Sequence, residues 1–243
     1  MLLLEKLNNA YQEGRKLLML LIDPDHFDEK HFEKTLLLSG EAGIDTILTG
    51  GSLITHGNMG NTIRSIKQMC DIPVCIFPGN YHQIDARADA ILFMSLISGR
   101  NPDFLIGNHV VAAPLLKNTN LEIIPTGYML IDGGKLTTAH YMSNTLPIPS
   151  DKPDIAACTA LAGQMLGMKC IYADGGSGAI QPMNEEFIKT VTSEISIPLI
   201  AGGGIRSAKT AKEITDAGAT AIVVGNAAEK NPEILKEIIS LIK

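Results

Sequence analysis

Short apolar runs recur along the chain, and most are followed by a loop and then by a segment with helical spacing. Runs that are apolar at consecutive positions are typical of parallel strands covered by helices on both faces. The eight expected strands are residues 17–22, 46–50, 73–77, 90–94, 122–131, 169–173, 198–202 and 221–225. The clearest helical patterns cover residues 28–43, 59–70, 154–167, 184–195 and 207–218.

Eight strand–helix alternations in 243 residues predict one α/β domain over residues 1–243, a (β/α)₈ TIM barrel. A doubly wound open sheet is the alternative, but it usually has fewer strands and carries its glycine fingerprint early in the chain. Here the glycine-rich turns follow the last three expected strands. Leucines at helical spacing near the start predict that residues 1–16 form an N-terminal capping helix.

Two connections depart from the regular alternation. Residues 78–90, after the third expected strand, have little helical character, so a full helix is expected to be missing there. Residues 131–154, after the fifth strand, show little strand or helix pattern. Loops of this length are usually functional or mobile, and this one falls at the carboxyl end of a strand, on the catalytic face of a barrel.

Composition narrows the class of protein. Apolar residues make up 45% of the chain, which is enough for a large core, and the net charge of −6 without a basic block disfavours nucleic acid. No apolar run is long enough for a transmembrane segment. Four scattered cysteines without a CxxC pair indicate reduced thiols in a cytoplasmic protein and make a zinc site improbable. The six histidines show no metal-binding spacing.

Two late glycine turns predict a phosphate site. In "IAGGGIRS" and "VVGNAAEK" a strand ends in glycine and a helix follows. Glycines let backbone N–H groups approach an anion, and the helix N-terminus adds a favourable dipole. Turns after strands seven and eight form the phosphate grip of many TIM barrels. The alternative interpretation is a pair of ordinary tight turns. The candidate residues are Gly203, Gly204, Gly225 and Asn226.

A third turn, "YADGGSGAI", joins an acid to exposed backbone. Gly175, Gly176, Ser177 and Gly178 could wrap the other side of the same phosphate. Tyr172 and Asp174 are two residues apart and are therefore expected on one side of the strand end. A carboxylate repels a phosphate, but it can accept a hydrogen bond from a hydroxyl or take its proton as a general base. The alternative for Asp174 is a solvated loop acid.

The early loops suggest a cation. In "LIDPDHF", Asp23 projects from the first strand, and Mg²⁺ accepts one or two carboxylates together with substrate phosphates. Asp25 could instead cap the following helix. In "LTGGSLITHG", Ser52 could orient a diphosphate or supply a hydroxyl ligand to the metal, although a simple Gly-Gly-Ser turn explains it equally well.

Taken together, the motifs "LIDPD", "TGGS", "FPGN", "YMLIDGG", "YMSNTLPIP", "YADGGSGA", "AGGGIRS" and "VVGNAAEK" resemble those of the geranylgeranylglyceryl phosphate synthase family, which includes PcrB-type heptaprenylglyceryl phosphate synthases. The likeness covers nearly the whole chain. The segment "YMSNTLPIP" resembles the larger synthase subgroup more than the shorter PcrB-type bacterial enzymes. The family often has Glu where this chain has Asp174. Its shorter members also carry a Lys just before the "DPD" motif, where this chain reads "MLLLI".

The resemblance implies a modified TIM barrel with its third helix replaced by irregular chain. It implies Mg²⁺ held by Asp23 and Ser52, and catalytic roles for Asp174, Tyr172 and Asp23. It also implies that sn-glycerol 1-phosphate is held by the segment from Tyr172 through Ala173 and Asp174 to Gly178, and by the two later turns. It further implies a role in ether-lipid synthesis. The cysteines indicate a cytoplasmic protein, and the apolar helix faces that a barrel of this size exposes predict a homo-oligomer.

The expected reaction is attack of the glycerol phosphate hydroxyl on the first carbon of geranylgeranyl diphosphate, or a related long prenyl diphosphate, with loss of pyrophosphate. The run "DAILFMSLISG" could line the prenyl site or belong to the core. Three alternatives share the phosphate grip. They are a sugar-phosphate isomerase, an FMN-dependent enzyme and a non-catalytic protein that binds phosphorylated metabolites.

Overall fold

Eight parallel strands close into a barrel in chain order in the computed structural model, which describes residues 2–243 apart from the side chain of His31. Strand β1 pairs with both β2 and β8, and this pairing closes the barrel. The strands are β1 (Leu17–Ile22), β2 (Thr46–Thr49), β3 (Val74–Ile76), β4 (Ala90–Leu96), β5 (Glu122–Leu130), β6 (Cys170–Asp174), β7 (Leu199–Gly202) and β8 (Ala221–Val224). The predicted TIM barrel is confirmed.

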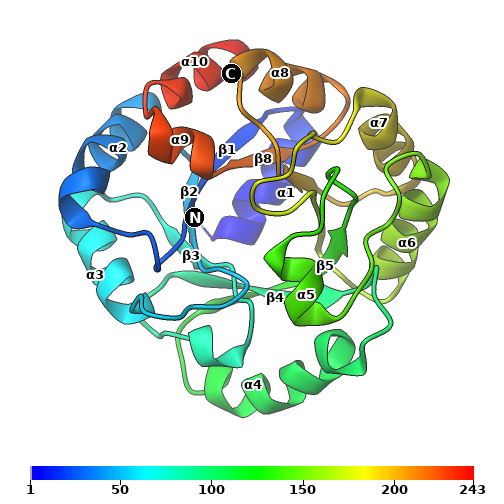
Figure 1. Cartoon of the computed structure of the whole chain (residues 1–243), viewed down its shortest axis with the longest axis horizontal. Coiled ribbons are helices and arrows are strands. Elements are labelled where there is room, and N and C mark those ends of the chain that lie inside the picture. Colours follow the sequence, from blue (N-terminus) through cyan, green and yellow to red (C-terminus); the bar gives the residue numbers. More distant parts are fainter. Residues whose placement is uncertain (1) are drawn as a thin grey trace.

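Most of the helices form a ring around the barrel, and α1 lies within that ring (Figure 1). In the described residues they are α1 (Leu3–Glu13), α2 (Glu29–Ala42), α3 (Met59–Met69), α4 (Asn108–Leu116), α5 (Thr138–Ser143), α6 (Pro153–Met165), α7 (Glu185–Glu194), α8 (Ala208–Asp216), α9 (Asn226–Lys230) and α10 (Ile234–Ile242). Helix α5 lies inside the ring, over the barrel (Figure 1).

Two apolar clusters explain why the strands are apolar on both faces. One lies between the strands and the helices, where β1 contributes Leu18 and Leu20. The other fills the barrel, where β1 contributes Leu17 and Met19. Helix α1 belongs to the second cluster, because its buried Leu7 packs with the interior side chains. The helix predicted within residues 1–16 therefore closes the barrel interior.

The connection from β3 to β4 lacks a full helix, as predicted. It contains one 3₁₀ turn, η1 (Tyr81–Gln83), stabilised by Asn80, whose side chain accepts a hydrogen bond from the His82 N–H. The next connection is covered by α4, which continues from a π-helical turn, η2 (Asp103–Gly107). The barrel therefore has a thin wall beside β3.

The long connection after β5 contains more structure than the sequence indicates. It holds the six-residue helix α5, which is too short to show a helical period, and an isolated bridge between Ile131 and Ile148. The N-terminus of α5 is fixed by a capping box in which the Nδ1 atom of His140 accepts the Thr137 N–H at 2.9 Å. The prediction that residues 131–154 have little regular structure was therefore wrong for Thr138–Ser143, which form α5.

Candidate active site

The glycine turns after β6 and β7 pack directly against each other. The Gly175 N–H donates to the Gly202 carbonyl at 3.0 Å. A side chain on Gly203 would place its Cβ 2.7 Å from the Gly175 nitrogen, so only glycine fits there. Gly203 also has a φ of +87°, which glycine adopts without strain. The two turns form one packed, glycine-rich surface at the carboxyl ends of neighbouring strands, in which Gly175 is buried and Gly203 and Gly204 are partly exposed.

The third turn follows the neighbouring strand β8. Gly225 precedes α9, which begins at Asn226. A Cβ on Gly225 would lie 3.4 Å from the Leu21 carbonyl oxygen, so this turn also faces the end of β1. We call residues 175–178, 203–204 and 225–226 the glycine clamp. The structure brings all the predicted clamp residues to the same edge of the barrel.

Asp174 is a buried carboxylate rather than a solvated loop acid. It ends β6, its Oδ2 accepts the Tyr128 hydroxyl at 2.6 Å, and its Oδ1 accepts the Gly176 N–H at 2.7 Å. Burial raises the pKa of Asp174, and the hydrogen bonds from Tyr128 and Gly176 offset only part of that rise. The carboxylate is fixed beside the glycine clamp and binds protons more readily than an exposed aspartate.

Tyr172 lies inside the barrel below the clamp. Its ring stacks on Tyr128 with a centroid distance of 5.5 Å and contacts Phe77. A Cβ on Gly202 would lie 2.4 Å from the Tyr172 hydroxyl, which places this hydroxyl at the start of the clamp. Burial, and then the charge of Asp174, raise the pKa of Tyr172, so the hydroxyl stays protonated. It can act as a donor to a bound ligand.

The side chains of Ala173 and Ser177, which lie in the same predicted segment, do not face the barrel interior. Ala173 packs in the cluster between barrel and helices, so its methyl group faces away from the barrel interior. Ser177 is exposed at the tip of its turn. Of the segment from Tyr172 to Gly178, the side chains of Tyr172 and Asp174 and the backbone of the turn therefore form the site.

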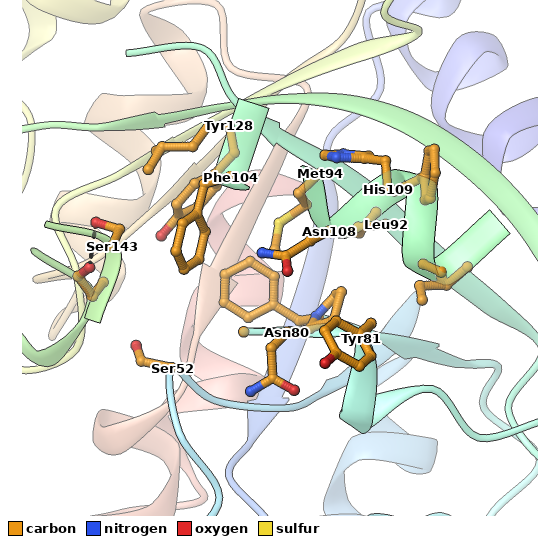
Figure 2. Close-up of a pocket in the computed structure, with 18 of the residues that line it drawn as sticks. Ser52, Asn80, Tyr81, Leu92, Met94, Phe104, Asn108, His109, Tyr128 and Ser143 are labelled. Carbon is orange, nitrogen blue, oxygen red and sulfur yellow. Dashed lines mark hydrogen bonds between the residues drawn. The ribbon is translucent and has the colours of Figure 1, made fainter. Parts of the chain in front are cut away.

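Asp23 lies beside the loop that follows β2. Its Oδ1 accepts the Asp25 N–H at 3.0 Å, and a Cβ on Gly51 would lie 3.2 Å from its Oδ2. Burial raises the pKa of Asp23. Ser52, the next residue in the β2 loop, lies at the edge of an apolar pocket (Figure 2). The structure therefore brings the loops that carry the two predicted metal ligands together.

Asp25 does not cap the next helix, which begins at Glu29. Its carboxylate accepts hydrogen bonds from the backbone N–H groups of Thr55, His56 and Gly57. Partial burial raises the pKa of Asp25, but these bonds outweigh it and hold the pKa well below its usual range. Asp25 ties the β1 loop to the β2 loop and so fixes the surroundings of Asp23.

The oxygen atoms near Asp23 decide whether the predicted Mg²⁺ ion could bind there. Among the described residues, no group of three His, Cys, Asp or Glu side chains could hold a metal ion. One half-buried carboxylate and a nearby hydroxyl supply hard oxygen atoms only. Mg²⁺ commonly binds through one or two carboxylates and completes its shell with water and substrate phosphates. Asp23 and Ser52 therefore fit Mg²⁺ bound through one carboxylate and one hydroxyl, with water and a phosphorylated substrate as the other ligands.

An apolar pocket lies next to Ser52 (Figure 2). It is on the side of the barrel where the β3–β4 connection lacks a full helix. Phe77, Asn80 and Tyr81 line it from the β3–β4 connection. Helix α4 and the turn before it contribute Phe104, Asn108, His109, Ala112 and Leu116. The predicted run after residue 89 lines the pocket through Ile91, Leu92, Phe93, Met94 and Leu96, and several of these side chains are also core. The run therefore contributes to the core, as one interpretation predicted, and also lines an apolar pocket; its role as a prenyl site stays a prediction.

The sequence reasoning missed several site residues. Tyr128 lies in the apolar half of its strand, just before Met129 and Leu130, and its phenol in that run was the available signal. The residues that α4 contributes were missed because the segment is apolar nearly throughout and shows no periodicity. His140 was missed because six residues give no helical pattern; it is buried, and its Nε2 atom has no hydrogen-bond partner among the described residues.

Comparison with known proteins identifies relatives over most of the chain. Residues 10–242 match the model of the PcrB family. The chain is 48% identical to the geranylgeranylglyceryl phosphate synthase of Spirosoma linguale over 230 residues, which cover 95% of this chain and 92% of the relative. It is 42% identical to the enzyme of the same name from Pyrococcus horikoshii, over 93% of this chain and 89% of the relative.

A solved structure supports the same relationship. The crystal structure of (S)-3-O-geranylgeranylglyceryl phosphate synthase from Thermoplasma acidophilum, in complex with its substrate sn-glycerol-1-phosphate, superposes with a TM-score of 0.93. The two chains are 34% identical, and the alignment covers 100% of this chain and 99% of the other. In the described part of this chain, the helices are too short or too polar for any of them to cross a membrane.

Proposed function

We propose a function from the premise that the chain belongs to the PcrB family. The protein joins sn-glycerol 1-phosphate to geranylgeranyl diphosphate, or to a related long prenyl diphosphate. The products are an ether-linked prenylglyceryl phosphate and pyrophosphate. The observation that carries this proposal is the position of a buried carboxylate, Asp174, beside a backbone clamp for phosphate and near the mouth of an apolar pocket.

The glycine clamp supports the choice of acceptor. Backbone N–H groups at glycine turns and at the start of a helix bind a phosphate without a charged side chain. A small polyol phosphate held there would place a hydroxyl near Asp174, whose carboxylate would repel a second phosphate. Asp174 accepts that hydrogen bond and takes the proton as the hydroxyl oxygen bonds to the first prenyl carbon. Holding the acceptor in this geometry supplies much of the catalysis.

The apolar pocket supports the choice of donor. Its aromatic and aliphatic lining suits a prenyl chain, whose removal from water drives binding. Asn80 and Ser52 at its edge suit the diphosphate end of the same molecule. The bond that breaks joins the first prenyl carbon to the diphosphate oxygen, so negative charge develops near Ser52 and Asp23.

Asp23 and Ser52 are the residues that would hold Mg²⁺. When bound, the ion supplies positive charge that neutralises the departing pyrophosphate. Asp23 is suited to this role because its Oδ1 is oriented by the Asp25 N–H, and the Asp25 side chain is itself fixed by the β2 loop. Ser52 adds a neutral oxygen from the neighbouring loop.

A pyrophosphate-release assay tests the proposed function. Purified protein is incubated with sn-glycerol 1-phosphate and prenyl diphosphates of ten, twenty and thirty-five carbons. We expect release that requires both substrates and favours a long donor. Asp174→Asn keeps an acceptor for the Tyr128 hydroxyl but cannot take a proton, so we expect kcat to fall about 10²–10⁴-fold. Binding of glycerol phosphate without release from any donor would contradict the enzymatic proposal.

We further propose that the protein is a cytoplasmic homo-oligomer. The outer face of α4 exposes Val110, Val111 and Leu115, and the end of α6 exposes Met165 and Leu166. A second copy would remove these apolar side chains from water. Light scattering coupled to size exclusion tests this, and Val111→Lys is expected to lower the measured mass. The free thiols of all four cysteines support a reducing compartment, which fractionation of the cells would test.

A further inference from the structure

The connection between β5 and α6 folds back over the glycine clamp. The Gly133 carbonyl accepts the Ile180 N–H at 2.7 Å, just beyond the turn after β6. A Cβ on Gly176 would lie 2.7 Å from the Thr137 Oγ1, so the connection packs on the turn itself. The residues between these two contacts, 134–136, are therefore held next to the clamp.

Lys135 lies in this stretch, and its ammonium group covers the turn. Its Nζ is 3.0 Å from the position that a Cβ on Gly178 would occupy, and its Cε is the other atom found within 4 Å of that position. Lys135 is exposed to solvent. In the part of the chain that the structure describes, no carboxylate lies within ion-pair distance of it, whereas ten other Lys or Arg side chains are paired with a carboxylate.

The other cation at this turn is already engaged. The guanidinium group of Arg206 donates to the Ala179 and Ile180 carbonyls, which supports the turn from the side of β7. A phosphate in the clamp would carry up to two negative charges, close to the ionised Asp174 and in a chain of net charge −6. Backbone N–H groups supply only partial positive charge. A mobile ammonium group beside Gly178 would supply a full one.

We propose that Lys135 is a further ligand of the acceptor, and that its ammonium group donates a hydrogen bond to the phosphate held in the glycine clamp. This assignment rests on the proposed function, which gives the clamp its glycerol phosphate. The residue binds substrate and takes no part in proton transfer. Its long side chain already places the ammonium group over the clamp, where it can meet the phosphate as a compact positive charge.

The test measures binding of sn-glycerol 1-phosphate by calorimetry without a prenyl donor, at low and high salt. Lys135→Gln keeps a polar side chain, one atom shorter, and removes its charge, so we expect about a tenfold rise in Kd at low salt and a smaller rise at high salt. Lys135→Arg should stay within about threefold of the unchanged protein. Lys236→Gln on α10, where Lys236 pairs with Glu41, is the matched control and should change nothing.

Kinetics separate a ligand from a structural residue. Lys135→Gln should raise the KM for glycerol phosphate while leaving kcat and the KM for the prenyl donor unchanged. A Kd within twofold of the unchanged protein at both salts would overturn the assignment. Failure of the proposed function would give a different result. The unchanged protein would then neither bind glycerol phosphate nor release pyrophosphate, but it would still bind inorganic phosphate, and Lys135→Gln would weaken that binding.

Discussion

The hydroxyl of Tyr128 donates to the Oδ2 of Asp174 at 2.6 Å, and both groups are buried. The pair joins two neighbouring strands, because Tyr128 on β5 stands opposite Tyr172 on β6, two residues before Asp174. Burial raises the pKa of Tyr128 far above its ordinary value, so it donates this hydrogen bond throughout the working pH range. Tyr128 thus orients the carboxylate and stabilises its ionised form.

The first prediction concerns the pH dependence of activity. The pKa of Asp174 is already raised by burial, and Tyr128→Phe removes a hydrogen bond that stabilises the ionised form. The pKa should therefore rise further, and activity that needs the ionised carboxylate should be lost at a higher pH. We expect the acidic limb of kcat/KM to shift upward by about one pH unit. A pH–rate profile checks this, and an unmoved limb would contradict the role of Tyr128.

Asp23 gives a prediction about the metal. Asp23→Asn keeps the shape of the side chain but removes the only charge offered to the ion by the predicted pair of ligands. We expect turnover to fall at least about 10²-fold while the Kd of glycerol phosphate, held at the other loops, changes less than about twofold. Turnover measured over a series of Mg²⁺ concentrations, with calorimetry alongside, tests this. A variant that retains full turnover would remove Asp23 from the metal site.

The apolar pocket allows a prediction about chain length. Ala112 on α4 lines the pocket and is buried, whereas Val110 on the same helix is 67% exposed. Ala112→Phe should fill the pocket and lower kcat/KM for a twenty-carbon donor at least about tenfold, with a ten-carbon donor much less affected. Val110→Phe adds similar bulk outside and serves as the control. Equal losses for both donors would indicate damage to the fold instead of a blocked pocket.

His140 makes stability depend on pH. Burial lowers its pKa in the folded protein, although Asp174 and Asp132 partly oppose this. The unfolded chain therefore takes up the proton first, and stability should fall as the pH drops below about 6.5. His140→Asn should reduce this fall. The unfolding free energies of the two proteins, measured at pH 7 and at pH 5, give the contribution of His140. Burial also lowers the pKa of His109, but this histidine is present in both proteins, so its contribution cancels.

The raised pKa of Asp174 acts in the opposite direction. Its contribution to stability grows as the pH falls through its folded pKa toward the ordinary value, so it reduces the acid loss caused by the histidine. Asp174 is present in both proteins and largely cancels in the comparison. Identical slopes with pH in the two proteins would show that His140 does not titrate on unfolding.

The fold was predictable because its strands are continuous apolar runs. The expected strand at residues 17–22 matches β1, and the other seven overlap their strands with ends within about two residues. Helix α4 was not predictable, since one side faces the pocket and the opposite side exposes Val110 and Val111. Such a helix is apolar around most of its circumference and shows no amphipathic period.

The site was predictable only where chemistry is local in the sequence. Glycine turns that follow strands can be recognised from a few neighbouring residues, and the structure places those turns together. The contacts of Tyr128 and Lys135 depend on which side chains meet across strands and loops. The first requires the register of β5 against β6, and the second requires the fold of the connection after β5. Neither follows from spacing along the chain.

The short 3₁₀ turn between β3 and β4 has a consequence for protein engineering. A regular amphipathic helix placed at residues 78–89 would cover β3 and β4 with side chains and would be expected to stabilise the barrel. The same side chains would occupy the volume now bounded by Tyr81, Ile84 and Ile91. A redesign that raises thermal stability at this position would therefore reduce the volume available to a lipid substrate. Stabilising substitutions are better placed on the opposite side of the molecule.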